Sequence, residues 1–135
     1  MRDGFEEYTP LALWKDYAAR PLYGVSMLGT FHMPMRDGVE LAADVYLPEG
    51  APLPVPALLV RTPYDKDDGA QTYFRYVRRG YAVVVQDVRG RNESGGEWLP
   101  HYYEVEDGDD TLTWVGTQEW CDGSVGMLGG SYLGY

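Results

Sequence analysis

The 135-residue sequence has few cations, one cysteine and no long hydrophobic run, and each scarcity excludes a class of protein. Eleven Lys and Arg stand against twenty-one Asp and Glu, a formal net charge of −10, whereas nucleic acids and anionic membrane surfaces are bound through clustered cations. Cys121 is the only cysteine, so neither an intramolecular disulfide nor a cysteine zinc cluster can form. A membrane-spanning helix needs about 18 consecutive apolar residues, and no such run occurs. We therefore expect neither a nucleic acid nor a membrane as a partner.

Apolar residues, by contrast, are plentiful. A hydrophobic fraction of 44% predicts a packed core, and the length predicts roughly one domain. Residues 1–22 mix charges with leucines and aromatics and are predicted to form an N-terminal arm or short helix, separate from residues 23–135. A lone thiol and a charged N-terminus, where a signal peptide would be apolar, favour a cytoplasmic protein.

The pattern from residue 25 onward predicts an α/β fold that opens with a β-hairpin. Residues 25–33 are apolar, residues 34–38 are typical of a turn, and residues 39–47 alternate between apolar and polar as a half-buried strand does. Four prolines make residues 48–56 a loop. Short apolar runs of the kind found in buried parallel strands follow at 57–60, 81–85 and 124–128.

Two helices are predicted between these strands. Asp67 or Asp68 can cap a helix that runs to Arg79 and ends at Gly80. Acidic residues from Glu104 onward favour the start of a second helix, whose apolar face would hold Val105, Leu112 and Val115. Strands that alternate with helices indicate a mainly parallel sheet with flanking helices.

The last predicted strand leads into Gly129-Gly130-Ser131-Tyr132-Leu133-Gly134. A serine on a sharp strand-to-helix turn with small neighbours is typical of a nucleophile elbow. Gly129 satisfies the first requirement, but the second glycine stands at 134 instead of 133. The motif alone also fits a glycine-rich turn with an idle serine, while a dinucleotide-binding turn would need G-x-G-x-x-G, which is absent here.

Several ordered segments resemble the cocaine esterase and X-prolyl dipeptidyl aminopeptidase family of α/β-hydrolases, which itself looks related to the α-amino acid ester hydrolases. In that family the elbow is typically G-x-S-Y-x-G, which Gly129 to Gly134 matches. The loop at 91–96 departs from the family pattern. The matching segments are Pro34-Met35-Arg36-Asp37-Gly38-Val39, Arg61-Thr62-Pro63-Tyr64-Asp65-Lys66, Arg79-Gly80-Tyr81-Ala82-Val83-Val84, Gln86-Asp87-Val88-Arg89-Gly90, Trp120-Cys121-Asp122-Gly123 and Gly126 to Gly134.

The resemblance implies a site without metal or cofactor. Ser131 would be the nucleophile and would form an acyl-enzyme. The backbone N–H of Tyr132 and the hydroxyl of Tyr64 would form the oxyanion hole, which stabilises the negative charge of the tetrahedral intermediate. The substrate would be a small ester, an amide or a short peptide, including Xaa-Pro peptides.

The other triad members are not found in these residues. In α/β-hydrolases the acid and then the histidine follow the serine, but His32 and His101 both precede Ser131. We therefore expect residues 23–135 to be the N-terminal portion of a serine hydrolase domain, with the acid and the histidine beyond Tyr135. The isolated chain is expected to be inactive and to self-associate. The alternatives are a non-catalytic, hydrolase-like binding module and, with less support, a nucleotide-binding α/β protein.

Other charged residues near the predicted strand ends have plainer interpretations. Asp87 and Arg89 follow the strand at 81–85 and are predicted to shape the next loop. His101, beside Pro100, is predicted to be a surface residue. The carboxylates between Glu106 and Asp110 could suggest a metal, but a solvated acidic helix start explains them better.

Overall fold

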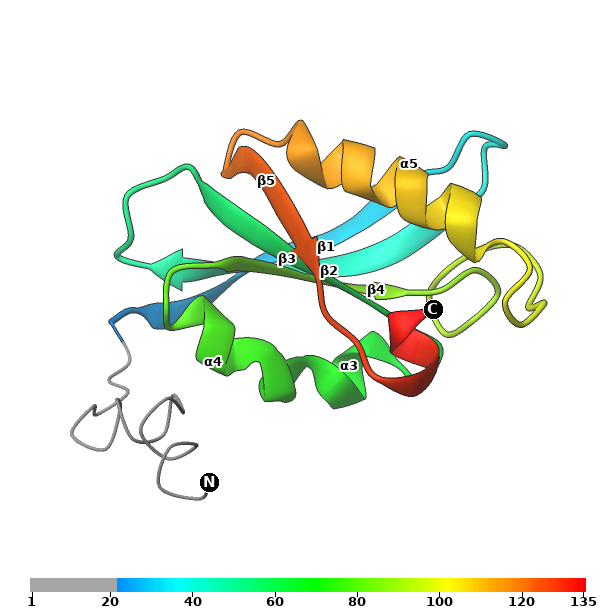
Figure 1. Cartoon of the computed structure of the whole chain (residues 1–135), viewed down its shortest axis with the longest axis horizontal. Coiled ribbons are helices and arrows are strands. Elements are labelled where there is room, and N and C mark those ends of the chain that lie inside the picture. The colour runs from blue at the N-terminus through cyan, green and yellow to red at the C-terminus, as the bar shows by residue number, and fades with distance from the viewer. Residues whose placement is uncertain (1–21) are drawn as a thin grey trace, which may run out of the picture.

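A computed structural model describes residues 22–135 (Figure 1). The predicted arm at residues 1–22 lies outside the described residues except for its last position. None of the helices within the described residues is long and apolar enough to cross a membrane.

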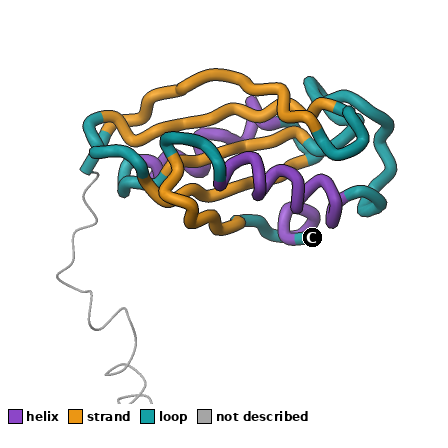
Figure 2. Tube along the Cα trace, turned by 90° about the horizontal axis from the view of Figure 1, so that it is seen from above, coloured by secondary structure: helices purple, strands orange, loops and turns teal. Residues whose placement is uncertain are grey.

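The described part of the chain forms one mixed sheet of five strands, ordered β1-β2-β4-β3-β5. The hairpin β1–β2 is antiparallel, and β2 pairs antiparallel with β4. The strands β4 and β5 both pair parallel with β3, which lies between them. Seen from above, the strands lie side by side as one layer (Figure 2). The opening hairpin and the parallel strands confirm the α/β prediction. The strands are β1 (Gly24–Pro34), β2 (Glu40–Glu49), β3 (Val55–Thr62), β4 (Ala82–Asp87) and β5 (Cys121–Met127).

Helices cover both faces of this sheet (Figure 1). One face carries three short helical segments in succession: α3 (Lys66–Gly69), the 3-10 helix η1 (Ala70–Tyr73) and α4 (Phe74–Val77). The other face carries the longer helix α5 (Glu104–Gly116). A final 3-10 helix, η2 (Ser131–Gly134), follows β5.

Two details of the strand prediction were wrong. The loop predicted at 48–56 is shorter, because β2 extends to Glu49 and β3 begins at Val55; the prolines in these strands lie near strand ends, where a missing N–H is tolerated. The strand predicted to be half-buried is buried on both faces from Leu41 to Tyr46. The alternation does separate two faces, but β2 lies inside the sheet and a helical layer covers each face.

The helix predictions also need correction. The residue that caps α3 is Asp65, whose carboxylate accepts a hydrogen bond from the Asp67 amide at 3.0 Å. In α5 the face toward the sheet contains Glu104, Asp107, Thr111 and Val115, whereas Val105 is 84% exposed. Polar residues can occupy that face because ion pairs and hydrogen bonds satisfy them, and periodicity of apolar residues alone does not reveal such a face.

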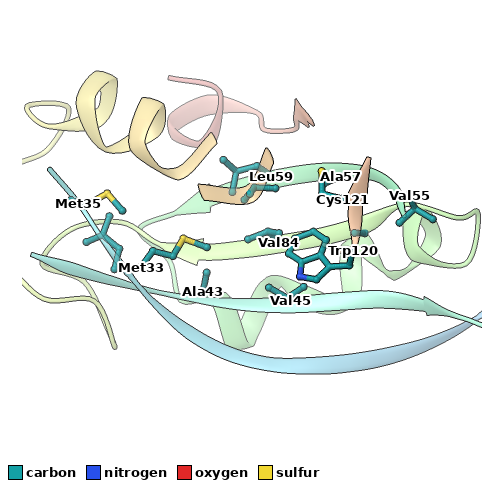
Figure 3. Close-up of a cluster of buried hydrophobic side chains, with 13 residues drawn as sticks. Met33, Met35, Ala43, Val45, Val55, Ala57, Leu59, Val84, Trp120 and Cys121 are labelled. Carbon is teal, nitrogen blue, oxygen red and sulfur yellow. The ribbon is translucent and has the colours of Figure 1, made fainter. Parts of the chain in front are cut away.

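The larger apolar cluster lies between the sheet and α5 and draws side chains from all five strands (Figure 3). The smaller cluster lies between the sheet and the α3–α4 segments and includes Leu133 of η2. The strand β4 contributes to both clusters, and all six of its residues are buried. It is therefore the strand around which both layers are packed.

Candidate active site

The carboxyl ends of β3, β4 and β5 lie at one edge of the sheet, because the three strands are parallel. In α/β proteins ligands bind at this edge. Tyr64 follows β3, the loop 88–98 follows β4, and Ser131 follows β5. The fold thus gathers all the predicted site segments at one edge.

Ser131 has a backbone conformation that L-residues other than glycine rarely adopt. Its φ is 56°, in the left-handed region, and it begins η2 directly after two glycines, shortly beyond the end of β5 at Met127. A left-handed non-glycine residue costs free energy and is found mainly where function requires it. Ser131 is exposed. The geometry is that of a strained serine presented at the end of a strand.

The flanking glycines are explained by close backbone approaches. A Cβ added to Gly129 would collide with the carbonyl oxygen of Leu133, and one added to Gly134 would lie 3.0 Å from the carbonyl oxygen of Gly129. The turn therefore closes between positions 129 and 134. Position 133, between Ser131 and Gly134, holds a large residue: the Leu133 side chain packs against the smaller apolar cluster, between the sheet and the α3–α4 segments.

The two residues after Ser131 anchor the turn to opposite layers of the molecule. Leu133 packs on the α3–α4 side. The ring of Tyr132 stacks on His101, with centroids 4.3 Å apart, and its hydroxyl accepts a hydrogen bond from the His101 amide at 3.1 Å. Burial and the carboxylate of Glu104 raise the pKa of the Tyr132 hydroxyl above its ordinary value. The side chain of Tyr132 therefore stays neutral and acts as a packing anchor.

Tyr64 lies in the loop immediately after β3 and is 64% exposed. Its amide donates a hydrogen bond to Thr62 Oγ1 at 3.0 Å, which shapes the turn. A pocket of about 250 Å³ has both Tyr64 and Leu133 in its wall. The structure thus brings the Tyr64 loop and the Ser131 turn to one pocket.

A buried lysine, Lys66, holds the loop that carries Tyr64 in place. Lys66 is 1% exposed, and its Nζ lies 3.2 Å from a carboxylate oxygen of Asp44, which is also buried, and 3.3 Å from one of Glu93. Burial lowers the pKa of Lys66, but hydrogen bonds with Asp67 and Asp44 outweigh it, so that the pKa lies above its ordinary value. Lys66 therefore remains charged and joins β2 to the loops after β3 and β4.

A second buried ion pair joins β3 to α5. Arg61 Nη1 lies 3.0 Å from Glu104 Oε2, and Arg61 Nε donates to Gln86 Oε1 at 2.7 Å. The remaining nitrogen, Arg61 Nη2, is buried and has no hydrogen-bond partner among the described residues. Breaking such a pair leaves an uncompensated charge in the interior, so this pair holds the start of α5 against the sheet.

Asp87 and Arg89 shape the loop after β4, as predicted. Asp87 is fully buried and accepts hydrogen bonds from the amides of Lys66 and Glu93, at 2.8 and 3.2 Å. Arg89 pairs with Asp107 at 2.7 Å and with Asp37 at 2.8 Å. Both side chains are thus engaged by structural partners.

The acidic start of α5 is not simply solvated, contrary to prediction. Asp107 is 1% exposed and pairs with Arg89, while Asp109 and Asp110 pair with Arg36. Arginines from distant parts of the chain reach these carboxylates, which a local sequence pattern cannot show. No group of His, Cys, Asp or Glu residues within 22–135 is arranged to hold a metal.

Sequence reasoning missed three residues beside the site: Arg91, Trp98 and His101. The side chain of His101 was predicted merely to lie at the surface; it is exposed but stacks on Tyr132. Trp98 also faces Tyr132, with ring centroids 5.7 Å apart. The only signal in the sequence was the density of aromatics between residues 98 and 103.

The five-stranded sheet and the strained serine after β5 define the class: this is the N-terminal part of an α/β-hydrolase fold. The family model described as X-Pro dipeptidyl-peptidase (S15 family) matches residues 37–135. The chain belongs to this family.

Similar proteins of known sequence or structure support this family assignment. The chain is 51% identical over 115 residues to the cocaine esterase of Rhodococcus sp. (strain MB1 Bresler), an alignment that covers 81% of this chain and 20% of that protein. An α-amino acid ester hydrolase structure superimposes with a TM-score of 0.73 at 29% identity, over 94% of this chain and 25% of that one. An aminopeptidase structure from the marine sediment archaeon Thaumarchaeota archaeon gives a TM-score of 0.73 at 27% identity, over 84% and 22% of the two chains. The chain thus spans about a fifth of the length of that cocaine esterase.

Proposed function

We propose that this chain supplies the nucleophile and the oxyanion donors of a serine hydrolase that cleaves ester or amide bonds. The observation that carries the proposal is the left-handed φ of 56° at Ser131, in a turn closed between Gly129 and Gly134. Family membership supports the class of reaction, since the relatives are esterases and peptidases.

In the proposed reaction Ser131 Oγ attacks the substrate carbonyl carbon, and its proton passes to a histidine base. The tetrahedral intermediate then collapses, the ester or amide bond breaks, and the base returns the proton to the leaving alcohol or amine. Water hydrolyses the resulting acyl-enzyme by the same steps. The base and the acid that orients it would follow Tyr135 in the chain order of this fold.

Two donors would stabilise the negative oxygen of the intermediate. The backbone N–H of Tyr132 directly follows the nucleophile, in the first turn of η2 where amides lack a partner within the helix. The hydroxyl of Tyr64 would reach the same oxygen from the loop after β3. The shared pocket of Tyr64 and Leu133 supports this pairing.

The proposed substrates are acyl esters, Xaa-Pro peptides and amino-acid esters, a range supported by the X-Pro dipeptidyl-peptidase family and by relatives that are named as a cocaine esterase and an α-amino acid ester hydrolase. The fold and the serine turn are common to all of these reactions, so the choice among them rests on parts of the pocket outside this chain. We further propose that the protein is cytoplasmic, on the sequence grounds given above.

The test uses a fluorophosphonate, which labels only an activated serine, and hydrolysis of p-nitrophenyl esters. The protein would carry residues 1–135 followed by the rest of an S15-family catalytic domain, its own or that of the Rhodococcus cocaine esterase. We expect labelling and turnover, and the loss of both in Ser131→Ala. Ser124→Ala, which alters another exposed serine on β5, is the matched control and should retain both.

Two outcomes would contradict the proposal. Turnover that survives Ser131→Ala would remove the nucleophile assignment. A correctly folded protein that takes up no label would favour the alternative, a hydrolase-like binding module. The 135-residue chain alone should give neither label nor turnover, because no base follows Ser131 in it.

A further inference from the structure

We infer that Arg91 is a positioning residue for this reaction: it links the loop that carries Tyr64 to the aromatic side chains around Tyr132. The two proposed oxyanion donors would then keep a fixed separation. This inference rests on the proposed function and extends it to a residue that takes no part in bond making or breaking.

Arg91 contacts both sides of the site through different parts of one guanidinium group. Its Nε donates a hydrogen bond to the carbonyl oxygen of Pro63 at 2.9 Å. Pro63 directly precedes Tyr64, so this bond restrains the peptide that positions the tyrosine. The guanidinium carbon lies 5.2 Å from the centre of the Trp98 ring, within cation–π range.

From Trp98 the contacts continue to the serine turn. The rings of Trp98 and Tyr132 lie 5.7 Å apart, and Tyr132 stacks on His101 on another side. The Tyr132 hydroxyl is held by the His101 amide. Pro63, Arg91, Trp98 and Tyr132 therefore form a continuous series of contacts from one proposed donor to the other.

The loop 88–98, from which Arg91 projects, is itself firmly held. Its Val88 amide donates to the carbonyl of Thr62 at 3.0 Å, and its Gly90 amide donates to the carbonyl of Gly95 at 2.8 Å. A Cβ on Gly90, whose φ is +73°, would collide with the backbone nitrogen of Trp98. Arg91 therefore acts from a rigid base, as a group that positions a catalytic donor must.

Arginine suits this place better than lysine. A planar guanidinium can donate from Nε while its face lies over an aromatic ring, whereas an ammonium group offers no comparable face. A role in attracting a charged substrate would need only the positive charge. The two roles can thus be separated by Arg91→Lys, which keeps the charge and loses the geometry.

The experiment measures kcat and KM for p-nitrophenyl ester hydrolysis in the full-length enzyme defined above. We expect Arg91→Ala to lower kcat about tenfold with KM changed less than about twofold, because misplaced donors weaken transition-state binding and not substrate binding. Arg91→Lys should resemble Arg91→Ala. In a Tyr64→Phe background, where the donor is already absent, Arg91→Ala should lower kcat by less than about twofold.

The matched control is Arg75→Ala. Arg75 is also exposed and also lies over a ring, that of Tyr76 at 5.0 Å, but belongs to α4. The Arg75→Ala substitution should leave kcat unchanged, and circular dichroism should show that all variants are folded.

Three outcomes would overturn the inference: an unchanged kcat in Arg91→Ala, full activity in Arg91→Lys, or the same tenfold loss with and without the Tyr64 hydroxyl. Each is distinct from failure of the proposed function, which is tested by whether Ser131→Ala keeps its turnover.

Discussion

The loops after β4 and β5 lie on either side of the Tyr64 loop, and they are built in opposite ways. The loop after β4 is held by a buried carboxylate, Asp87, and by a series of backbone hydrogen bonds. The loop after β5 is a short turn with an exposed serine in a strained conformation. The strands beneath them differ likewise, since β4 is wholly buried while β5, within residues 22–135, pairs with β3 alone.

Structural support and proposed chemistry are therefore divided between neighbouring loops. A strained residue persists only where its surroundings determine its conformation. For the Ser131 turn, Leu133 packed on the α3–α4 side and Tyr132 held by Trp98 and His101 provide that constraint. Lys66 and Asp87 hold the neighbouring loops after β3 and β4. Substitutions of the buried charged residues should therefore lower stability, whereas substitutions of the proposed donors, or of Arg91, which positions them, should lower activity.

The largest expected effect is on stability, from Lys66→Met. This change leaves the buried Asp44 carboxylate without its cation and should lower the free energy of unfolding by about 3–5 kcal/mol. The measurement is urea denaturation followed by tryptophan fluorescence. The double variant Lys66→Met/Asp44→Asn should recover part of the loss; if it is as unstable as the sum of the single variants, the pair does not act as a unit.

Tyr64→Phe, in contrast to Lys66→Met, should lower activity and leave stability nearly unchanged. Removal of this proposed oxyanion donor should lower kcat by about 10²–10³, equivalent to about 3–4 kcal/mol of transition-state stabilisation. The exposed ring remains, so the denaturation midpoint should hardly move. An increase in KM alone would mean that the hydroxyl contacts the bound substrate and not the transition state.

A smaller effect on stability should distinguish the strands β4 and β5. Val84→Ala removes two buried methyl groups from the centre of β4 and should cost about 2 kcal/mol. Val125→Ala makes the same change in β5, where the side chain is only half-buried, and should cost less than about 1 kcal/mol. Equal losses in denaturant titrations would show that β5 is as well packed as β4.

The smallest effect concerns pH and the ion pairs at the surface. Hydrogen bonds from Arg36 hold the pKa of Asp110 below its ordinary value of 3.8. A carboxyl whose pKa is lowered by folding stabilises the folded state above its unfolded pKa, and that contribution is lost as the pH falls through the folded value. The melting temperature of Arg36→Gln should therefore lie below that of the wild type at pH 7, and the two should converge as the pH falls below the ordinary value of 3.8 and Asp110 becomes protonated. If the difference in melting temperature between the wild type and Arg36→Gln stayed the same at low pH, the Arg36–Asp110 pair would not be its cause.

Much of the site was predictable because its signals are local. A glycine, a serine and a second glycine at fixed spacing after an apolar run indicated the turn at Ser131, and close backbone contacts at Gly129 and Gly134 explain that spacing. The start of α5 was predicted from its acidic residues for the same reason. Its buried face was not, since Glu104 and Asp107 are buried against Arg61 and Arg89, which lie far away in the chain.

The order of strands and helices, the serine turn and the family resemblance could be predicted from the sequence, because each depends on neighbouring residues and on the close backbone approaches that glycine allows. Which charges are buried, and what joins the Tyr64 loop to the turn at Ser131, depends on the tertiary structure. Lys66 with Asp44, and Arg91 with Pro63 and Trp98, meet only after the strands are ordered in the sheet. Such contacts follow from the relative positions of distant segments, and no local pattern encodes them.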